Sequence, residues 1–246
     1  MKTCSKLSVF CALLVLSASF ACADTINLGS FATGTTAAFL GFNASQTAMN
    51  LAGFTSFPSP PALGSTPILL NGTANTYALA PVGVWANALG NSTWIGNAPT
   101  AGPVGTDPAW GYYQYTTQFT AVGGTGYSGT FDVMADDTAE ILLNGVVIVP
   151  FGALGSDSHC ADSGISCGGG DMVPVSGLSL LSGPGANLLT FVVEQAGTQA
   201  LNQDPSGLDF TATLATSAVP EPTSLALLGT GLVSAASLFY RKRQIA

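Results

Sequence analysis

Hydrophobic and polar positions alternate with a period of two over several short stretches of this chain. Between residues 127 and 135, the side chains of Phe131, Val133 and Ala135 fall on one face. This pattern is typical of a β-strand with one side toward a core. Residues 109–122, which are rich in aromatic residues and threonine, predict a longer strand directly before it.

The clearest local prediction is a β-hairpin over residues 139–149. Two apolar runs flank Asn144 and Gly145, and Asn-Gly tolerates the positive φ angles of a type I′ turn. Further strands are predicted at 188–194 and 208–216. Because Gly, Pro and polar residues separate these runs and almost no helical period appears, we expect an all-β fold, a single β-sandwich of jelly-roll type.

The first 23 residues predict a cleavable signal peptide. A basic start precedes an apolar run at 7–16, which we expect to form a signal helix, and Ala21-Cys22-Ala23 has the small residues of a cleavage site. Such a signal engages the export machinery and signal peptidase, which would cut after Ala23. In the alternative, Cys22 is a lipoprotein cysteine, but Phe20 stands where lipoprotein signals prefer a small residue.

The last 28 residues predict a sorting signal that passes through a membrane. A Pro-Glu-Pro motif comes first, an uncharged run of 18 residues at 223–240 follows, and a basic cluster comes after it. The run is near the lower limit for a helix spanning a hydrocarbon core of about 30 Å, so we expect a C-terminal transmembrane helix. The basic cluster would stay in the cytoplasm, which leaves the main domain outside. The motif and the cluster consist of Pro220, Glu221, Pro222, Arg241, Lys242 and Arg243.

These three parts, in this order, resemble the PEP-CTERM sorting signal, a tail also known as the ice-binding-protein C-terminal domain. The resemblance implies recognition by an exosortase-type membrane enzyme near Pro220 to Pro222 and loss of the hydrophobic tail. It also implies a membrane-anchored stage followed by a place at the cell surface or in the extracellular polysaccharide of a Gram-negative bacterium. A plain single-pass anchor is the alternative, and it has the same topology. The predicted signal peptide, β-sandwich ectodomain and sorting signal then span residues 1–23, 24–218 and 219–246.

The distribution of charge limits what the predicted ectodomain can do. All five basic residues lie in the two terminal signals, so residues 24–219 contain no Lys or Arg but 12 of the 13 carboxylates. Without cationic side chains this part cannot neutralise phosphates, and nucleic-acid binding is excluded. Unpaired carboxylates suit calcium, although an acidic surface also keeps exported proteins soluble.

A second resemblance covers about half of the chain. An aromatic strand at 112–119, an acidic pair at Asp136 and Asp137, and a strand ending in Asn144-Gly145 are similar to the galactose-binding-like jelly roll. In that fold an Asp-rich loop precedes a strand that ends in Asn-Gly. The resemblance implies a fold, but it does not choose between binding modules, enzyme accessories and structural domains, because the fold hosts all three.

Two cysteines remain once the signal peptide is removed. Six residues separate Cys160 from Cys167 in a Gly-rich segment, which in an exported protein predicts a disulfide. A metal site would have only His159 to add to them, and a Cys-His dyad would lose its thiol on oxidation. A serine hydrolase would likewise have only His159 as its base.

Asp136, Asp137 and Glu140 form the densest acidic group. They could ligate calcium together with backbone carbonyls, or they could bond to nearby backbone amides and start a turn. Carboxylates could also pair as the acid and nucleophile of a retaining glycoside hydrolase, which needs about 5–5.5 Å between them. The candidates for such a pair are Asp132, Asp136, Asp137, Glu140, Glu194, Asp204 and Asp209.

Large aromatic side chains could stack on sugar rings in a cleft, or they could pack in the core and on strand faces. They are Trp85, Trp94, Trp110, Tyr112, Tyr113 and Tyr115. We therefore expect an exported, non-catalytic β-sandwich that acts by structure or by binding extracellular polysaccharide, with calcium as its one possible cofactor. A secreted glycoside hydrolase or an accessory module is the alternative.

Overall fold

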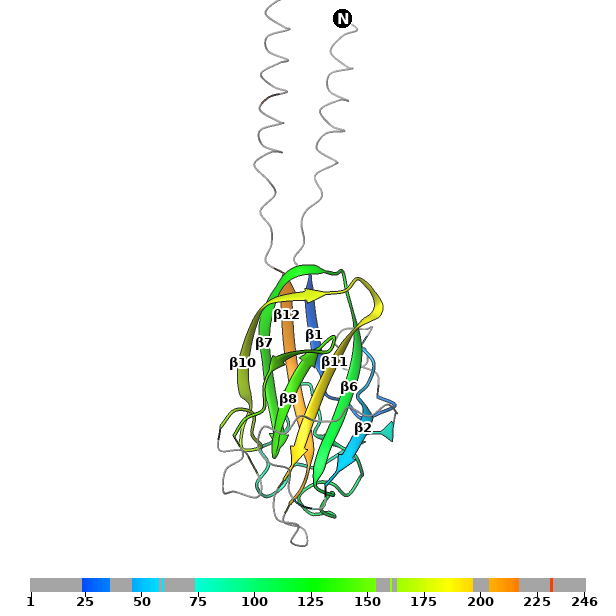
Figure 1. Cartoon of the computed structure of the whole chain (residues 1–246), viewed down its shortest axis with the longest axis vertical. Coiled ribbons are helices and arrows are strands. Elements are labelled where there is room, and N and C mark those ends of the chain that lie inside the picture. Colours follow the sequence, from blue (N-terminus) through cyan, green and yellow to red (C-terminus); the bar gives the residue numbers. More distant parts are fainter. Residues whose placement is uncertain are drawn as a thin grey trace, which may run out of the picture. The chain divides into compact units, whose positions relative to one another are not determined.

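The computed structural model describes residues 24–35, 46–57, 59, 74–153, 160, 163–196, 204–216 and 231. Asp24 to Thr216 form one compact unit, and every regular element described in it is a β-strand (Figure 1). The predicted signal helix and, except for Gly231, the predicted transmembrane helix lie outside the described residues. Within the described part of the chain, no helix has the length and apolar character of a membrane span.

Two antiparallel sheets of six strands each make up this unit. The first contains β1 (Thr25–Gly29), β4 (Tyr77–Ala78), β5 (Ile95–Gly96), β7 (Gly124–Asp136), β10 (Asp171–Leu180) and β12 (Gly207–Thr216). The second contains β2 (Asn50–Ser56), β3 (Ala74–Asn75), β6 (Gly111–Ala121), β8 (Thr138–Leu143), β9 (Val146–Val149) and β11 (Gly183–Gln195).

The strand order confirms a β-sandwich. The first sheet has the order β10-β7-β12-β5-β4, with β1 paired to β12, and the second has the order β3-β2-β6-β11-β8-β9. The chain changes sheet between β6 and β7, between β7 and β8, and again on both sides of β11. Repeated crossing between two sheets is typical of jelly rolls.

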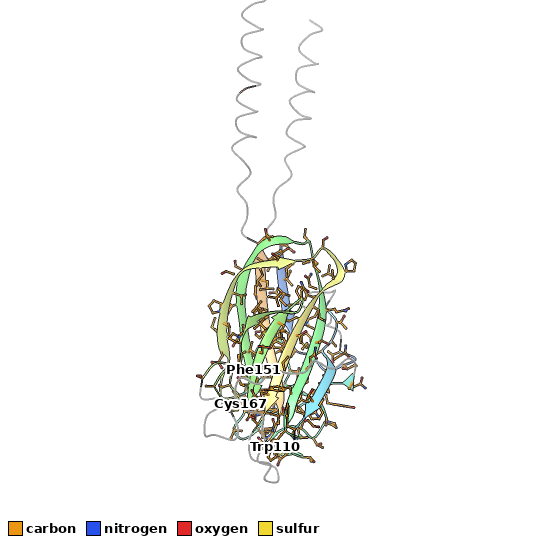
Figure 2. The ribbon with its side chains drawn as sticks, in the orientation of Figure 1. Trp110, Phe151 and Cys167 are labelled. Carbon is orange, nitrogen blue, oxygen red and sulfur yellow. A yellow bond between two sulfur atoms is a disulfide. The ribbon has the colours of Figure 1, made fainter. Side chains whose placement is uncertain are left out.

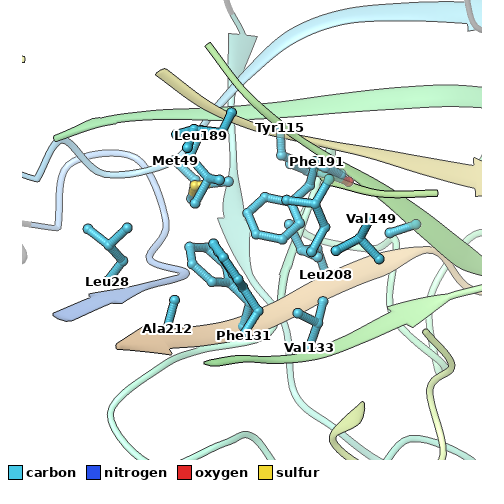
Figure 3. Packing of buried hydrophobic residues seen from close by; sticks show 14 of the residues in the cluster. Leu28, Met49, Tyr115, Phe131, Val133, Val149, Leu189, Phe191, Leu208 and Ala212 are labelled. Carbon is cyan, nitrogen blue, oxygen red and sulfur yellow. The ribbon is translucent and has the colours of Figure 1, made fainter. Parts of the chain in front are cut away.

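The core lies between the two sheets and is built from alternating side chains (Figure 3). Phe131, Val133 and Ala135 of β7 all belong to it, as their alternation predicted. The rings of Phe191 on β11 and Phe210 on β12 lie 4.3 Å apart between their centroids and so join the two sheets. Each fully buried side chain of this size stabilises the fold by about 1.5–3 kcal/mol relative to leaving it exposed.

The predicted hairpin is also confirmed. Strands β8 and β9 flank Asn144 and Gly145, whose φ angles are 51° and 80°, and two positive φ angles are what a type I′ turn requires. The Asn144 side chain accepts a hydrogen bond from the Leu188 amide and donates one to Asn187, which fastens the turn to β11. The strands predicted at 109–122, 188–194 and 208–216 correspond to β6, β11 and β12.

The two ends of the compact unit leave the sandwich together. β1 pairs with the last part of β12, and the Thr216 amide donates a 3.1 Å hydrogen bond to the Asp24 carbonyl. We call this the exit end. The opposite end, where Asp136 of β7 pairs with Gly207 of β12, is called the acidic end. Ten residues of β12 separate the two ends, which corresponds to about 33 Å at the usual rise of a strand.

Candidate functional site

Four carboxylates meet at the acidic end. Asp136 ends β7, Asp137 follows it directly, Glu194 lies near the end of β11, and Asp204 precedes β12. None of the four is more than 2% exposed. We call these residues the acidic cluster.

Backbone pairing holds the cluster together. The Asp137 amide donates to the Glu194 carbonyl at 2.9 Å, which ties the β7–β8 connection to β11. The Asp136–Asp137 peptide bond is cis. Gly207 faces the Trp85 ring so closely that a Cβ atom there would lie 2.6 Å from Cη2 of the indole. A glycine at this position therefore lets Trp85 reach the cluster.

The carboxylates of the cluster differ in how many hydrogen bonds they accept. Trp85 Nε1 donates to Asp136 Oδ2 at 2.5 Å, and the Ala196 amide donates to Asp137 Oδ2 at 2.6 Å. Three carboxylate oxygens accept no hydrogen bond from any residue that the structure describes. They are both oxygens of Asp204 and Oε2 of Glu194. Buried oxygen atoms of this kind are costly when they are ionised and unpaired.

Burial raises the pKa values of these carboxylates. The pKa of Glu194 rises to about 7, first because of burial and then because of the Asp137 charge, against a lowering by the hydroxyl of Tyr112. The pKa of Asp204 also rises to about 7, through burial and the charges of Asp137 and Asp107, while the nearby Gln195 side chain lowers it. The pKa of Asp136 is raised well above its ordinary value by burial and by Asp137.

No lysine or arginine of the domain can neutralise the cluster, because residues 24–219 contain neither. Protons can do this near neutral pH, and so can a bound cation. The donor atoms are hard carboxylate oxygens, the type that calcium prefers. However, among the described residues no three His, Cys, Asp or Glu side chains have an arrangement that could hold a metal ion.

The structure brings two of the three predicted calcium ligands together. Asp136 and Asp137 interact directly, whereas Glu140 lies on β8 opposite Val192, and burial alone raises its pKa. The Asp136 and Asp137 oxygens accept hydrogen bonds from the Trp85 side chain and the Ala196 amide, which are distant in sequence and are not the nearby backbone amides that the turn interpretation expects.

The seven candidates for a hydrolytic pair separate in a similar way. Asp136, Asp137, Glu194 and Asp204 form the cluster, while Asp132 interacts with Asp171. Asp209 is fixed by hydrogen bonds from the Ser30 hydroxyl and the Leu89 amide. All of the candidates in the cluster are buried, so a substrate would have to displace part of the sandwich to reach them.

The aromatic residues mostly pack inside the protein. Trp85, Trp94, Tyr112, Tyr113 and Tyr115 are at most 5% exposed, and the two indole rings stack with centroids 4.1 Å apart. This confirms the packing interpretation for five of the six. Trp110 is partly exposed and lies at the acidic end, directly before β6 (Figure 2).

The predicted disulfide between Cys160 and Cys167 is present. The loop that it closes docks on the first sheet at Ser166, whose carbonyl accepts a 3.0 Å hydrogen bond from the Ala135 amide of β7. The Cys167 carbonyl accepts a 3.1 Å hydrogen bond from the Ala86 amide. Cys167 is buried in the same hydrophobic cluster as Trp85. The disulfide loop therefore packs near the residue that donates to Asp136 of the acidic cluster.

Residues 164–168 have the Gly-x-Ser-x-Gly pattern of a hydrolase elbow. Such an elbow needs a strand-to-helix turn that exposes the serine. Here Ser166 lies in an irregular segment before β10 and its neighbour Cys167 is in the disulfide, so the pattern has no catalytic context. His159 lies outside the described residues.

The comparison with protein families concerns the C-terminus. Residues 218–243 match the PEP-CTERM protein-sorting motif. The match confirms the predicted sorting tail and indicates an exported protein with a C-terminal sorting signal. The PEP-CTERM residues themselves, Pro220 to Pro222 and Arg241 to Arg243, lie outside the described residues, as does Ala23. The motif begins two residues after β12 ends at Thr216.

No curated protein matches the chain. Matching solved structures include a β-glucosidase from Kluyveromyces marxianus in complex with glucose, at 14% identity and a TM-score of 0.26 over 51% of this chain and 13% of that one. Another is a GH26-CBM35 β-(1,4)-mannanase from Podospora anserina, at 14% identity and a TM-score of 0.28 over 60% of this chain and 26% of that one. The chain therefore covers about a quarter or less of the length of either enzyme.

Two features of the site are not predicted by the sequence. The sequence predicts a core or sugar-stacking role for Trp85, whereas its indole donates to a carboxylate 51 residues away. Asp107 accepts a hydrogen bond from the Asp204 amide and raises the pKa of the Asp204 side chain. Neither link has a local signal, because each depends on which loops meet at the acidic end.

Proposed function

We propose that this protein is displayed outside the cell by its sorting tail and acts as a non-catalytic β-sandwich at the cell surface or in the extracellular polysaccharide matrix. The observation that carries the proposal is the pairing of β1 with β12. Because of it, both chain ends leave at the exit end, and the PEP-CTERM motif starts two residues beyond. The acidic end is then the part of the domain farthest from the attachment point.

A structural role is supported better than sugar stacking on the strand faces. Five of the six candidate aromatic residues are buried, so they cannot present flat rings to a glycan. Any carbohydrate contact would instead use the loops of the acidic end, where Trp110 is partly exposed. A glycan array probed with the domain, beside a Trp110→Ala variant, distinguishes these roles. Signal that is lost in the variant would favour binding, and a blank array would favour structure.

Display at the surface can be tested directly in cells that carry an exosortase-type enzyme. The intact chain should be digested by protease added outside the cells, and a variant with Pro220→Ala and Pro222→Ala should stay in the membrane fraction at its unprocessed length. A variant with Thr211→Ser, in the middle of β12, is a matched control that leaves the motif unchanged. Intact protein that remains protected inside the cells would contradict the proposal.

Calcium at the acidic end stays a prediction. Its support is chemical, since the cluster supplies buried oxygen donors and no cationic side chain. Calcium should raise the melting midpoint of the domain relative to a chelator. Magnesium at the same concentration should raise the midpoint less, because the smaller magnesium ion requires a stricter coordination geometry. An unchanged midpoint in calcium would count against this prediction.

Glycoside hydrolysis is the second candidate, and the raised pKa of Glu194 is the one feature that favours it. A general acid with a pKa near 7 suits catalysis at neutral pH. Complete burial of Glu194 opposes this role. Turnover of aryl glycosides that is lost in Glu194→Gln but kept in Glu140→Gln would establish an enzyme.

A further inference from the structure

Two turns lie side by side at the exit end. The β6–β7 turn contains Val122 and Gly123, and the β10–β11 turn contains Leu181 and Ser182. A Cβ atom on Gly123 would lie 2.7 Å from the Ser182 amide nitrogen, so the two turns are in contact. Pairing of the adjoining strands fixes this arrangement, with Leu180 opposite Gly124.

Each of the two turns exposes one large apolar side chain. Val122 is 74% exposed and Leu181 is 55% exposed. Single exposed apolar residues are ordinary on a protein surface. Val122 and Leu181 differ from the other exposed apolar residues in their position, because they lie on adjacent turns at the end where the chain leaves the domain.

Carboxylates are few at the exit end and many at the acidic end. Asp24 is the one carboxylate that the structure places at the exit end, and its Oδ2 accepts hydrogen bonds from the Tyr127 hydroxyl at 2.8 Å and the Val122 amide at 3.2 Å. The buried carboxylates gather at the acidic end. Among the described residues the exit end thus carries a single carboxylate, which is already hydrogen-bonded, and a surface with few charges can approach lipid at a lower desolvation cost.

The length of the following chain keeps this surface close to the tail. The uncharged run begins at residue 223, seven residues after the last residue of β12. Seven residues span at most about 25 Å when fully extended. If the run enters a bilayer, Thr216 at the exit end is held within that distance of the membrane.

We propose that the exit end is a membrane-facing surface, on which Val122 and Leu181 insert into the interfacial region of the lipid bilayer while the tail is still attached. The inference rests on the proposed membrane-anchored stage. The contact needs no anionic lipid, because the described surface offers no cationic side chain, and it would orient the acidic end away from the bilayer. Removal of the tail would release the contact, since two apolar side chains bury too little area to hold the domain alone.

The test uses the chain from Asp24 to Ala246, whose own cysteines are paired in the disulfide. Val122→Cys, Leu181→Cys and Val104→Cys are each labelled with a polarity-sensitive fluorophore and reconstituted into phosphatidylcholine vesicles that contain a lipid quencher in the upper acyl region. Val104 is the matched control, because it is an equally exposed apolar residue, at 78%, in the loop that leads to Asp107 at the acidic end.

We expect vesicle-bound chains to show quenching at positions 122 and 181 that is at least threefold stronger than at position 104. Equal, weak quenching at all three positions in chains that float with the vesicles would overturn the membrane-facing surface and leave the anchored stage intact. Failure of the chains to float would overturn both proposals.

Discussion

The indole nitrogen of Trp85 donates a hydrogen bond of 2.5 Å to Oδ2 of Asp136, a side chain with no solvent exposure. The bond joins the loop before β5 to the end of β7, across 51 residues of sequence. It lowers the pKa of Asp136, against the larger opposing effects of burial and of Asp137. Trp85 thus supplies the one side-chain N–H bond recorded to Asp136 among the described residues.

Replacing Trp85 with Phe should therefore destabilise the domain, and the loss should grow as the pH rises, because the indole lowers the pKa of Asp136 and so favours its ionised form. Loss of a buried hydrogen bond to a charged group costs about 2 kcal/mol. Trp94→Phe is the matched control, because its indole donates to the neutral Ala86 carbonyl at 3.1 Å. Denaturant unfolding of both variants across a range of pH values measures the difference. Equal pH dependence in the two variants would show that Trp85 acts only by packing.

The stability of the whole domain should fall between about pH 4 and pH 7. The folded-state pKa values of Glu194 and Asp204, both about 7, lie above their ordinary values of 4.5 and 3.8. The folded state therefore binds protons more tightly than the unfolded state, and the resulting stability is complete below about pH 4 and is lost as the pH rises to about 7.

Denaturant midpoints measured across this range in a chelating buffer check that expectation. The Glu194→Gln and Asp204→Asn double variant should have a flatter profile than the native chain. A Glu140→Gln variant should keep most of the slope, because Glu140 lies outside the cluster. A native profile that rises with pH would contradict the electrostatic account of the acidic end.

Loss of the disulfide should cost about 2–3 kcal/mol, the amount expected for closing a loop of this size. Cys160→Ala with Cys167→Ala removes the bond without adding a polar group beside Trp85. The native chain should lose a similar amount in reductant, and the double variant should be insensitive to reductant. Identical stability of the native chain with and without reductant would show that the docked segment holds itself in place.

The β8–β9 turn should be sensitive to a single methyl group. Gly145→Ala places a Cβ on a residue with a φ angle of 80°, which costs about 1 kcal/mol. Gly168→Ala is the control, since its φ angle is ordinary and nothing lies within 4 Å of the added atom. Thermal unfolding should separate the two variants, and equal midpoints would contradict the type I′ assignment.

The sequence predicted the strands whose side chains alternate in the core. β7, β11 and β12 carry regular apolar positions, and the β8–β9 turn has its own Asn-Gly signal. β10 was missed because Pro174 and Gly177 interrupt it and its side chains are mostly exposed. As an edge strand it can accommodate both residues. β1 and β2 were missed because each gains its pairing from strands that are distant in sequence.

The candidate site was predictable only in part. Asp136 and Asp137 are adjacent in sequence and Glu140 is close to them, so the sequence predicted one acidic group made of all three. Strand pairing instead places Glu194 and Asp204 at the cluster, because β11 ends and β12 begins at the same end of the sandwich at which β7 ends. The register of the long strands decides which carboxylates meet at the acidic end, and residue spacing in the sequence does not determine that register.

The two termini of the finished protein test the central claim most directly. Mass spectrometry of protein recovered from outside cells that carry an exosortase-type enzyme should show a new N-terminus at Asp24 and a C-terminus near Pro220 to Pro222, with the Cys160–Cys167 bond intact. Recovery of the full chain of 246 residues from the cytoplasm, with both terminal signals retained, would contradict export and sorting, and with them the display of the β-sandwich.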